Sequence, residues 1–177
     1  MKINNWKLLL IALILAGCGG QQRMASRYYL IEEPDNSAEL IVTAPGPVQD
    51  YCEISQVNVY PAYASPKIAI RSDNHEIIYY SFHHWAVRPG DSFTRMLEDY
   101  MTRTNIFKRV STRFWRVEPA YKIETTIEKI EIVQHTDGYS ARLALELSLM
   151  DNNTNNLILN HEADRTKQLD KKDLNLF

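Results

Sequence analysis

The pattern of apolar and polar positions beyond residue 27 predicts mainly β-strands. Its clearest stretch is 142–149, where leucines alternate with polar or small residues as in a half-buried antiparallel strand. A second stretch, 121–132, changes parity near Glu128 and Lys129, which predicts a bulge or bend there. Shorter strands are expected at 28–31, 39–42, 54–60, 67–71, 76–80 and 157–161, and the pair 67–71 and 76–80 is expected to form a hairpin that turns at 72–75.

One segment has the periodicity of a helix instead. Apolar residues from Phe93 to Thr104 recur at spacings of three and four, so they form a single stripe along one side. Pro89 suits a first helical turn, Asp91 places negative charge at the positive end of the helix dipole, and Asn105 can end the helix. The stripe consists of Phe93, Met96, Leu97, Tyr100, Met101 and Thr104.

These elements predict one α/β (α+β) domain of two layers, with a mostly antiparallel or mixed sheet of about six strands and one amphipathic helix. One helix is about 10 Å across, whereas six strands span roughly 24 Å, so a single helix leaves part of the sheet uncovered. The chain stops at 174–177, where a second helix could begin. Two alternatives stay open: a C-terminal helix is missing from the chain, or a partner covers the gap.

The N-terminal segment has the pattern of an export signal. Lys2 and Lys7 precede an apolar run at 8–16, and its rise of about 14 Å as a helix is too short for a hydrocarbon core of about 30 Å. The run ends in Leu-Ala-Gly-Cys at 15–18, and small residues before a cysteine resemble the lipobox of bacterial lipoproteins. In that class the cysteine, here Cys18, is alkylated with diacylglycerol and the chain is cut before it. An ordinary cysteine after a signal peptide is the alternative.

We therefore expect a signal peptide at 1–17, a lipidated N-terminus and linker at 18–27, and one domain at 28–177. The new amine of Cys18 is usually acylated in this class, with a fatty acid such as palmitate, and more than one acyl chain gives stable anchoring. Gly19, in place of an aspartate, resembles the default signal for the outer membrane, so the domain is expected on its periplasmic face. The linker 19–27 reaches at most about 30 Å.

The composition of the chain mainly excludes classes of protein to which it could otherwise belong. Removal of Lys2 and Lys7 with the signal lowers the net charge from −2 to −4, which gives no long-range attraction to nucleic acid. The charged fraction of 24% with 10% aromatic residues is typical of a globular chain rather than a disordered one. With Cys18 lipidated, Cys52 has no partner for an intramolecular disulfide and is expected to be a small buried residue.

The sequence carries no recognised motif of catalysis, cofactor binding or metal binding. The two His-Glu pairs, at 75–76 and 161–162, lack the second histidine of a zinc-protease helix. The adjacent His83 and His84 would point to opposite faces of a strand, so they cannot easily share a metal. The sequence predicts a binding protein with no catalytic residues, no cofactor and no metal, not an enzyme.

One basic and aromatic stretch is a candidate contact surface. Between 103 and 116 the chain carries five cations and no acid, interleaved with Phe107, Phe114 and Trp115. Contact with anionic lipid headgroups or with an acidic partner is one interpretation. A solvated face with the aromatic side chains turned inward is the more common alternative. The cations are Arg103, Lys108, Arg109, Arg113 and Arg116.

An ordered set of short motifs resembles one known family. The set comprises the lipobox, Tyr28-Tyr29-Leu30, residues 68–71, Tyr79-Tyr80, His84-Trp85-Ala86 and the helix 93–104. From Cys18 to Arg165 this order is similar to the ABC-type transport auxiliary lipoproteins, the PqiC-like family. The resemblance implies a compact α/β domain related to the amino-terminal domain of TolB, in which Trp85 packs under the helix.

The resemblance also implies a function. It suggests a non-enzymatic docking subunit beside an MCE-domain protein and its ABC permease and ATPase, which move phospholipids between the two membranes and so maintain envelope integrity. An assembly lipoprotein for an outer-membrane barrel or secretin, in lipopolysaccharide or surface-structure export, is the alternative. A lipid-tethered hydrolase is a third interpretation, which the missing motifs disfavour. Self-association into a homo-oligomer stays open.

Two departures from the family concern the helix layer. The family has an acid and Pro-Leu where this chain has Val-Arg-Pro-Gly at 87–90, at the entrance to the helix. It also ends in a second long helix, which the chain lacks.

Cys18→Ala is expected to leave the precursor unprocessed, because the thiol that accepts the diacylglycerol is gone. Palmitate labelling, gel mobility and membrane fractionation measure this, and Cys52→Ser is expected to leave function intact. Normal processing and membrane fractionation of Cys18→Ala would refute the lipoprotein interpretation.

Overall fold

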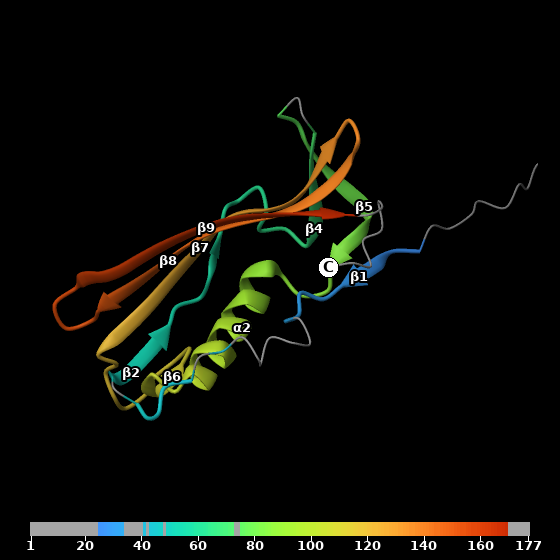
Figure 1. Ribbon diagram of the computed structural model, residues 1–177. Coiled ribbons are helices and arrows are strands. Elements are labelled where there is room, and N and C mark those ends of the chain that lie inside the picture. Colours follow the sequence, from blue (N-terminus) through green and yellow to red (C-terminus); the bar gives the residue numbers. More distant parts are fainter. Residues whose placement is uncertain (1–24, 34–40, 42, 48, 73–74, 170–177) are drawn as a thin grey trace, which may run out of the picture.

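The computed structural model describes residues 25–33, 41, 43–47, 49–72 and 75–169. Within them, one helix lies against a mixed sheet (Figure 1). The elements are β1 (Arg27–Tyr29), β2 (Gln49–Ile54), β3 (Asn58–Val59), β4 (Lys67–Ser72), β5 (Ile77–Trp85), α2 (Pro89–Thr104), β6 (Phe107–Ser111), β7 (Tyr121–His135), β8 (Gly138–Asp151) and β9 (Asn156–Leu169).

The sheet is organised along β7. One edge of β7 pairs antiparallel with β8 over its whole length, and β9 continues beyond β8. The other edge pairs in parallel with three strands in succession, through Cys52 with Tyr121, Asn58 with Thr126, and Ala69 with Glu131. The β2–β6 pair therefore flanks the first half of β7, and the β4–β5–β1 group flanks its second half (Figure 1).

The expected α+β class with one helix and a mixed sheet is confirmed, but the strand count was wrong. The described residues contain nine strands rather than about six. The expected strand 54–60 is interrupted at 55–57, and β9 continues eight residues past His161. The segment 39–42, apart from Ile41, and the chain end at 170–177, where the second helix was considered, lie outside the described residues.

The predicted bulge in β7 is present and has a structural consequence. The register between β7 and β8 shifts between Ile127 and Lys129. Ile123 and Ile127 before the bulge, and Ile132 after it, are all buried. Because side chains alternate along a strand, the extra residue keeps both halves of β7 turned to the same apolar face.

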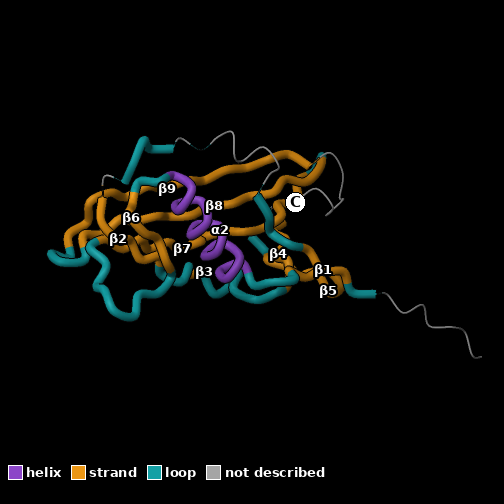
Figure 2. Tube along the Cα trace, turned by 90° about the horizontal axis from the view of Figure 1, so that it is seen from below, coloured by secondary structure: helices purple, strands orange, loops and turns teal. Residues whose placement is uncertain are grey.

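Helix α2 begins at Pro89 and ends at Asn105, as the sequence predicts, and Asn105 adopts the left-handed conformation with φ 53°. Its first turn lies close to the segment between β2 and β3. A Cβ on Gly90 would approach the Val57 carbonyl oxygen to 2.8 Å, so this contact requires glycine. Thr94 Oγ1 accepts a hydrogen bond from the buried Val57 amide at 2.9 Å. The Val-Arg-Pro-Gly entrance thus positions the helix across the sheet (Figure 2).

Two buried clusters lie at successive points along β7. One joins Ile68, Ile70, Trp85 and Ile132 near β4 and β5. The other joins the β2 side chains to Phe107 and Ile123, with Leu97 and Met101 of α2 packed against it. Trp85 is 4% exposed, in keeping with the core role expected for it.

Cys52 belongs to the second cluster and is fully buried, as the sequence predicts. Burial, with a smaller effect of neighbouring Glu53, raises the pKa of its thiol to about 12. The thiol therefore stays protonated and unreactive at neutral pH.

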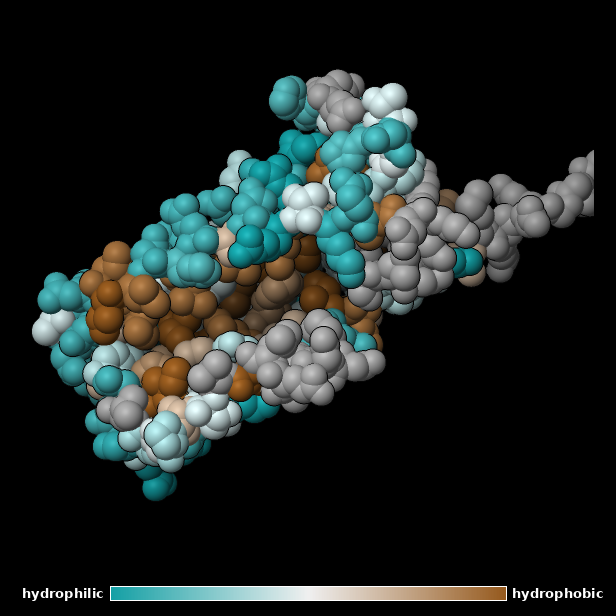
Figure 3. All heavy atoms as spheres, in the orientation of Figure 1, coloured by the Kyte–Doolittle hydropathy of each residue, from teal (hydrophilic) through white to brown (hydrophobic). Residues whose placement is uncertain are grey.

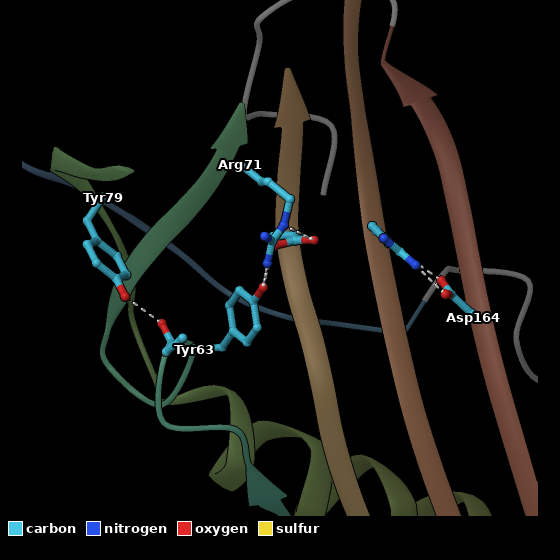
Figure 4. A network of polar contacts seen from close by, with 7 residues as sticks. Tyr63, Arg71, Tyr79 and Asp164 are labelled. Atoms are coloured by element: carbon cyan, nitrogen blue, oxygen red, sulfur yellow. Dashed lines mark hydrogen bonds and ion pairs between the residues drawn. The ribbon is translucent and has the colours of Figure 1, made fainter. Parts of the chain in front are cut away.

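A buried polar cluster joins β4 to β7 on the opposite face of the sheet. Arg71 Nε donates to both Glu131 carboxylate oxygens at 3.0 and 2.9 Å, and Arg71 Nη2 donates to Tyr63 Oη at 2.6 Å. The Tyr63 hydroxyl donates in turn to Glu131. Burial and this hydrogen bond raise the pKa of Tyr63 to about 12. Figure 4 shows Tyr63 and Arg71 converging on β7, and Asp164 across the sheet on β9.

Arg71→Met is expected to lower the free energy of unfolding by about 3 kcal/mol, because it leaves the fully buried Glu131 carboxylate without its cation. Arg142→Met is the matched control. It breaks the ion pair between Arg142 and Asp164, in which both side chains are partly exposed, and is expected to cost less than about 1 kcal/mol. Chemical denaturation measures both, and equal losses would contradict the assignment of Arg71 as a buried partner.

Candidate functional site

The predicted basic stretch forms a surface on β6 and the loop that follows it. We call Lys108, Arg109, Arg113, Trp115 and Arg116 the basic-aromatic surface. β6 pairs with β2 and with no other described strand, so its outer edge is open. All five residues are exposed.

Only weak internal contacts hold these cations. Lys108 lies 3.5 Å from Asp50, and both side chains are more than half exposed, so the pair contributes little. The Arg109 guanidinium lies 5.8 Å from the Phe114 ring centre. The Arg113 guanidinium lies 5.0 Å from the ring centre of Trp115. The positive charge of this surface is therefore largely available to an external anion.

The three aromatic residues do not all turn inward. Phe107 is buried, and the half-buried Phe114 stacks on Tyr51 with ring centres 5.8 Å apart. Trp115, in contrast, is 82% exposed. An indole held in water beside arginines is typical of a contact surface, because tryptophan and arginine are enriched where proteins bind partners.

Arg103 does not join this surface. It lies in the last turn of α2, where Nη2 contacts Glu33 at 2.5 Å. This ion pair holds the segment after β1 against the helix. Four of the five predicted cations thus lie on β6 and the loop that follows it, and the fifth is paired on the helix.

Cys18 and residues up to 24 lie outside the described residues, so the lipid attachment site stays a prediction. The chain becomes described at residue 25 and enters β1, which pairs with β5. The β4 and β2 groups contact β7 about eight residues apart, which corresponds to roughly 26 Å along a strand. The basic-aromatic surface therefore lies at the opposite end of the domain from β1 (Figure 1).

The adjacent histidines face opposite sides of β5. His83 Nδ1 hydrogen-bonds Tyr29 Oη at 2.7 Å, whereas the His84 ring packs against Tyr28. Burial, with the nearby Arg27 charge, lowers the pKa of His83. Among the described residues, no three His, Cys, Asp or Glu side chains are grouped so that they could hold a metal. That part of the chain also contains no helix long and apolar enough to cross a membrane.

An apolar groove between α2 and the sheet was not anticipated as a site. It consists of two cavities, of about 290 and 270 Å³, which share Phe93. Figure 3 shows the hollowed hydrophobic face to which they belong. The first cavity is lined chiefly by Ile68, Trp85, Phe93, Ile132 and Leu143, and the second by Val57, Phe93, Leu97, Leu145 and Leu147.

Cations lie at one end of this groove. Arg165 and Lys167 of β9 line the first cavity and pair in register with Leu143 and Ala141 of β8. Residues opposite each other in an antiparallel pair share a face, so both cations belong to the groove side. Their spacing of two, which places two cations on one face of a strand, was a usable sequence signal. It was missed because the expected strand ended at His161.

The family of the chain follows from its sequence match. Residues 29–174 match the family described as the ABC-type transport auxiliary lipoprotein component. The chain belongs to this family. This confirms the predicted family and supports a role as a transport auxiliary lipoprotein, in a family of auxiliary components rather than of enzymes. No curated protein matches the chain significantly.

Solved structures share the fold of this auxiliary lipoprotein. Protein XCC0632 from Xanthomonas campestris is 13% identical, with a TM-score of 0.68 and coverage of 83% of this chain and 81% of the other. An uncharacterised protein is 12% identical, with a TM-score of 0.63 and coverage of 86% of each chain. The hypothetical protein CT253 from Chlamydia trachomatis is 7% identical, with a TM-score of 0.50 and coverage of 69% and 74%. At such identities the likeness establishes the fold alone.

Trp115→Phe is expected to remove most of the acrylamide-quenchable tryptophan fluorescence and to leave the blue-shifted emission of buried Trp85. Trp6 belongs to the predicted signal peptide, so the processed chain retains these two indoles. Trp85→Phe is the converse control and should leave the quenchable emission. Unchanged quenching in Trp115→Phe would show that the indole is covered.

Proposed function

We propose that this lipoprotein is a non-enzymatic docking subunit of an ABC/MCE-type phospholipid transport system. In this proposal Cys18 anchors it to the periplasmic face of the outer membrane, and the basic-aromatic surface contacts the MCE-domain protein or its permease. The family match over residues 29–174 is the observation that carries the proposal. Energy for transport comes from an ATPase elsewhere, not from this chain.

The position of the basic-aromatic surface supports contact with a partner rather than with the anchoring membrane. The chain leaves its anchor through a linker of at most about 30 Å and enters the domain at β1. The surface lies at the far end of β7 from β1. A domain held at its β1 end thus presents Trp115 and its neighbouring arginines away from the anchor.

The chemistry of that surface defines the partner. Arg113 and Arg116 are exposed beside Trp115, and neither has an ion pair with a carboxylate in the described part of the chain. An acidic patch with an apolar pocket for an indole would complement it.

The direct test is photocrosslinking in the native cell, with benzoylphenylalanine in place of Trp115 in the full-length protein and mass spectrometry of the captured chain. We expect an MCE-domain protein or its permease. Capture of a barrel or secretin instead would support the assembly-lipoprotein alternative and refute the proposal.

Charge reversal tests whether the surface itself binds. Arg113→Glu with Arg116→Glu should lower capture by about tenfold or more, since two favourable contacts become repulsive. Arg27→Glu with Lys67→Glu reverses two exposed charges at the opposite end and is the matched control, expected to leave capture unchanged. Equal losses in both pairs would show that the surface has no specific role.

A further inference from the structure

The groove between α2 and the sheet combines an apolar floor with a cationic end. Ile68, Trp85 and Ile132 at the floor of the first cavity are among the most buried residues of the chain. Phe93 and Leu143 form its walls. Arg165 and Lys167 lie on the neighbouring edge strand, on the same side of the sheet.

We propose that this groove binds an acyl chain of a phospholipid whose anionic headgroup contacts Arg165 and Lys167. This proposal rests on the proposed function in one respect, because phospholipid transport would supply the lipid that the groove binds. It adds a lipid-binding role for this domain, distinct from the partner contact at the basic-aromatic surface.

The dimensions and lining of the groove suit a flexible apolar chain. The two cavities, at about 290 and 270 Å³, each lie just below the usual range for a small-molecule site, and together they lie within it. The lining of the groove is chiefly aliphatic and aromatic, which complements the methylene groups of an acyl chain.

The charges around the groove favour an anion at its β9 end. Arg142 is paired with Asp164, and Glu131 with Arg71. At the other rim Glu33 is paired with Arg103, which leaves Glu32 as the acid beside the first cavity among the residues that the structure describes.

Arg165 and Lys167 have no ion-pair partner within the described ranges. Two uncompensated cations beside one acid give this end a net positive charge. A phosphate headgroup complements that charge, and its acyl chain would fill the apolar cavity behind it.

The groove runs from the β1 end of the domain toward the β6 end, so a bound acyl chain would lie between these two ends. The first cavity includes Ile31, just after β1, where the chain arrives from its predicted anchor. The second cavity includes Leu147, which packs against the cluster around Phe107 at the start of β6. A lipid in the groove therefore lies along a line from the anchored end toward the basic-aromatic surface.

The test is photocrosslinking of full-length protein in cells grown with radioactive phosphate, with benzoylphenylalanine in place of Leu143 or Leu147. The predicted diacylglycerol on Cys18 carries no phosphorus, so a labelled adduct reports a captured phospholipid rather than the anchor. The matched control is Glu146, which lies on the same strand and on the opposite face. We expect labelled adducts at Leu143 and Leu147 and at least tenfold less at Glu146.

Charge reversal links the adduct to the cationic end. Arg165→Glu with Lys167→Glu should lower labelling at Leu143 by about tenfold or more. Both residues are exposed on an edge strand, so the fold is not at risk. Unchanged labelling would overturn the headgroup assignment.

Three other outcomes would overturn the proposal. Equal labelling at Leu143 and Glu146 indicates unspecific contact with a bilayer. An unlabelled adduct of twice the chain mass, or one with a different protein, shows that a second copy or a partner segment occupies the groove. No adduct at Leu143, under conditions where the Trp115 position captures protein, shows that the groove is empty in the cell.

The two proposals fail separately. Capture of an MCE-domain protein from Trp115 without a phospholipid adduct at Leu143 removes the lipid site and leaves the docking role. A phospholipid adduct without that capture leaves the lipid site and removes the docking role.

Discussion

The architecture of the described residues depends on one constraint, which is that helix α2 packs on the apolar face of a long strand. β7 keeps its isoleucines on one side through the bulge between Ile127 and Lys129, so this face is continuous along the domain. Helix α2 is fixed at its first turn by the contact between Gly90 and Val57. It buries the β2 end of the face with Leu97 and Met101, and leaves an apolar groove beside it.

This constraint also separates the surfaces of the domain. The β1 end receives the chain from its predicted anchor, and the β6 end carries the exposed Trp115. The groove connects the two ends. The buried contact between Arg71 and Glu131 holds the β4 group against β7 from the other face, and so maintains this spacing. A transport auxiliary lipoprotein needs such a layout if it is to be tethered at one end and to bind at the other.

Sequence pattern predicted the elements whose signals are local. The stripe from Phe93 to Thr104 gave the helix, and the parity change near Glu128 gave the bulge. The sequence pattern could not predict the parallel pairing of β7 with β2, β3 and β4, because no local signal encodes contacts between distant segments. The contact of Arg71 with Glu131 and the groove both depend on that pairing. The second half of β9 was missed because its exposed residues, Asp164 to Gln168, are polar on both faces.

The most direct measurement of the central claim is the reactivity of an introduced thiol at Leu145→Cys in protein released from the membrane and freed of bound phospholipid. Cys52 is buried and unreactive, and Cys18 is expected to carry lipid. Any maleimide labelling therefore comes from the introduced thiol. An open groove predicts that the thiol at 145 reacts with a maleimide, more slowly than Asn160→Cys on the exposed edge strand because Leu145 is half-buried. A thiol at 145 that fails to react, while the thiol at 160 does, would show that the groove is already closed and would contradict the account.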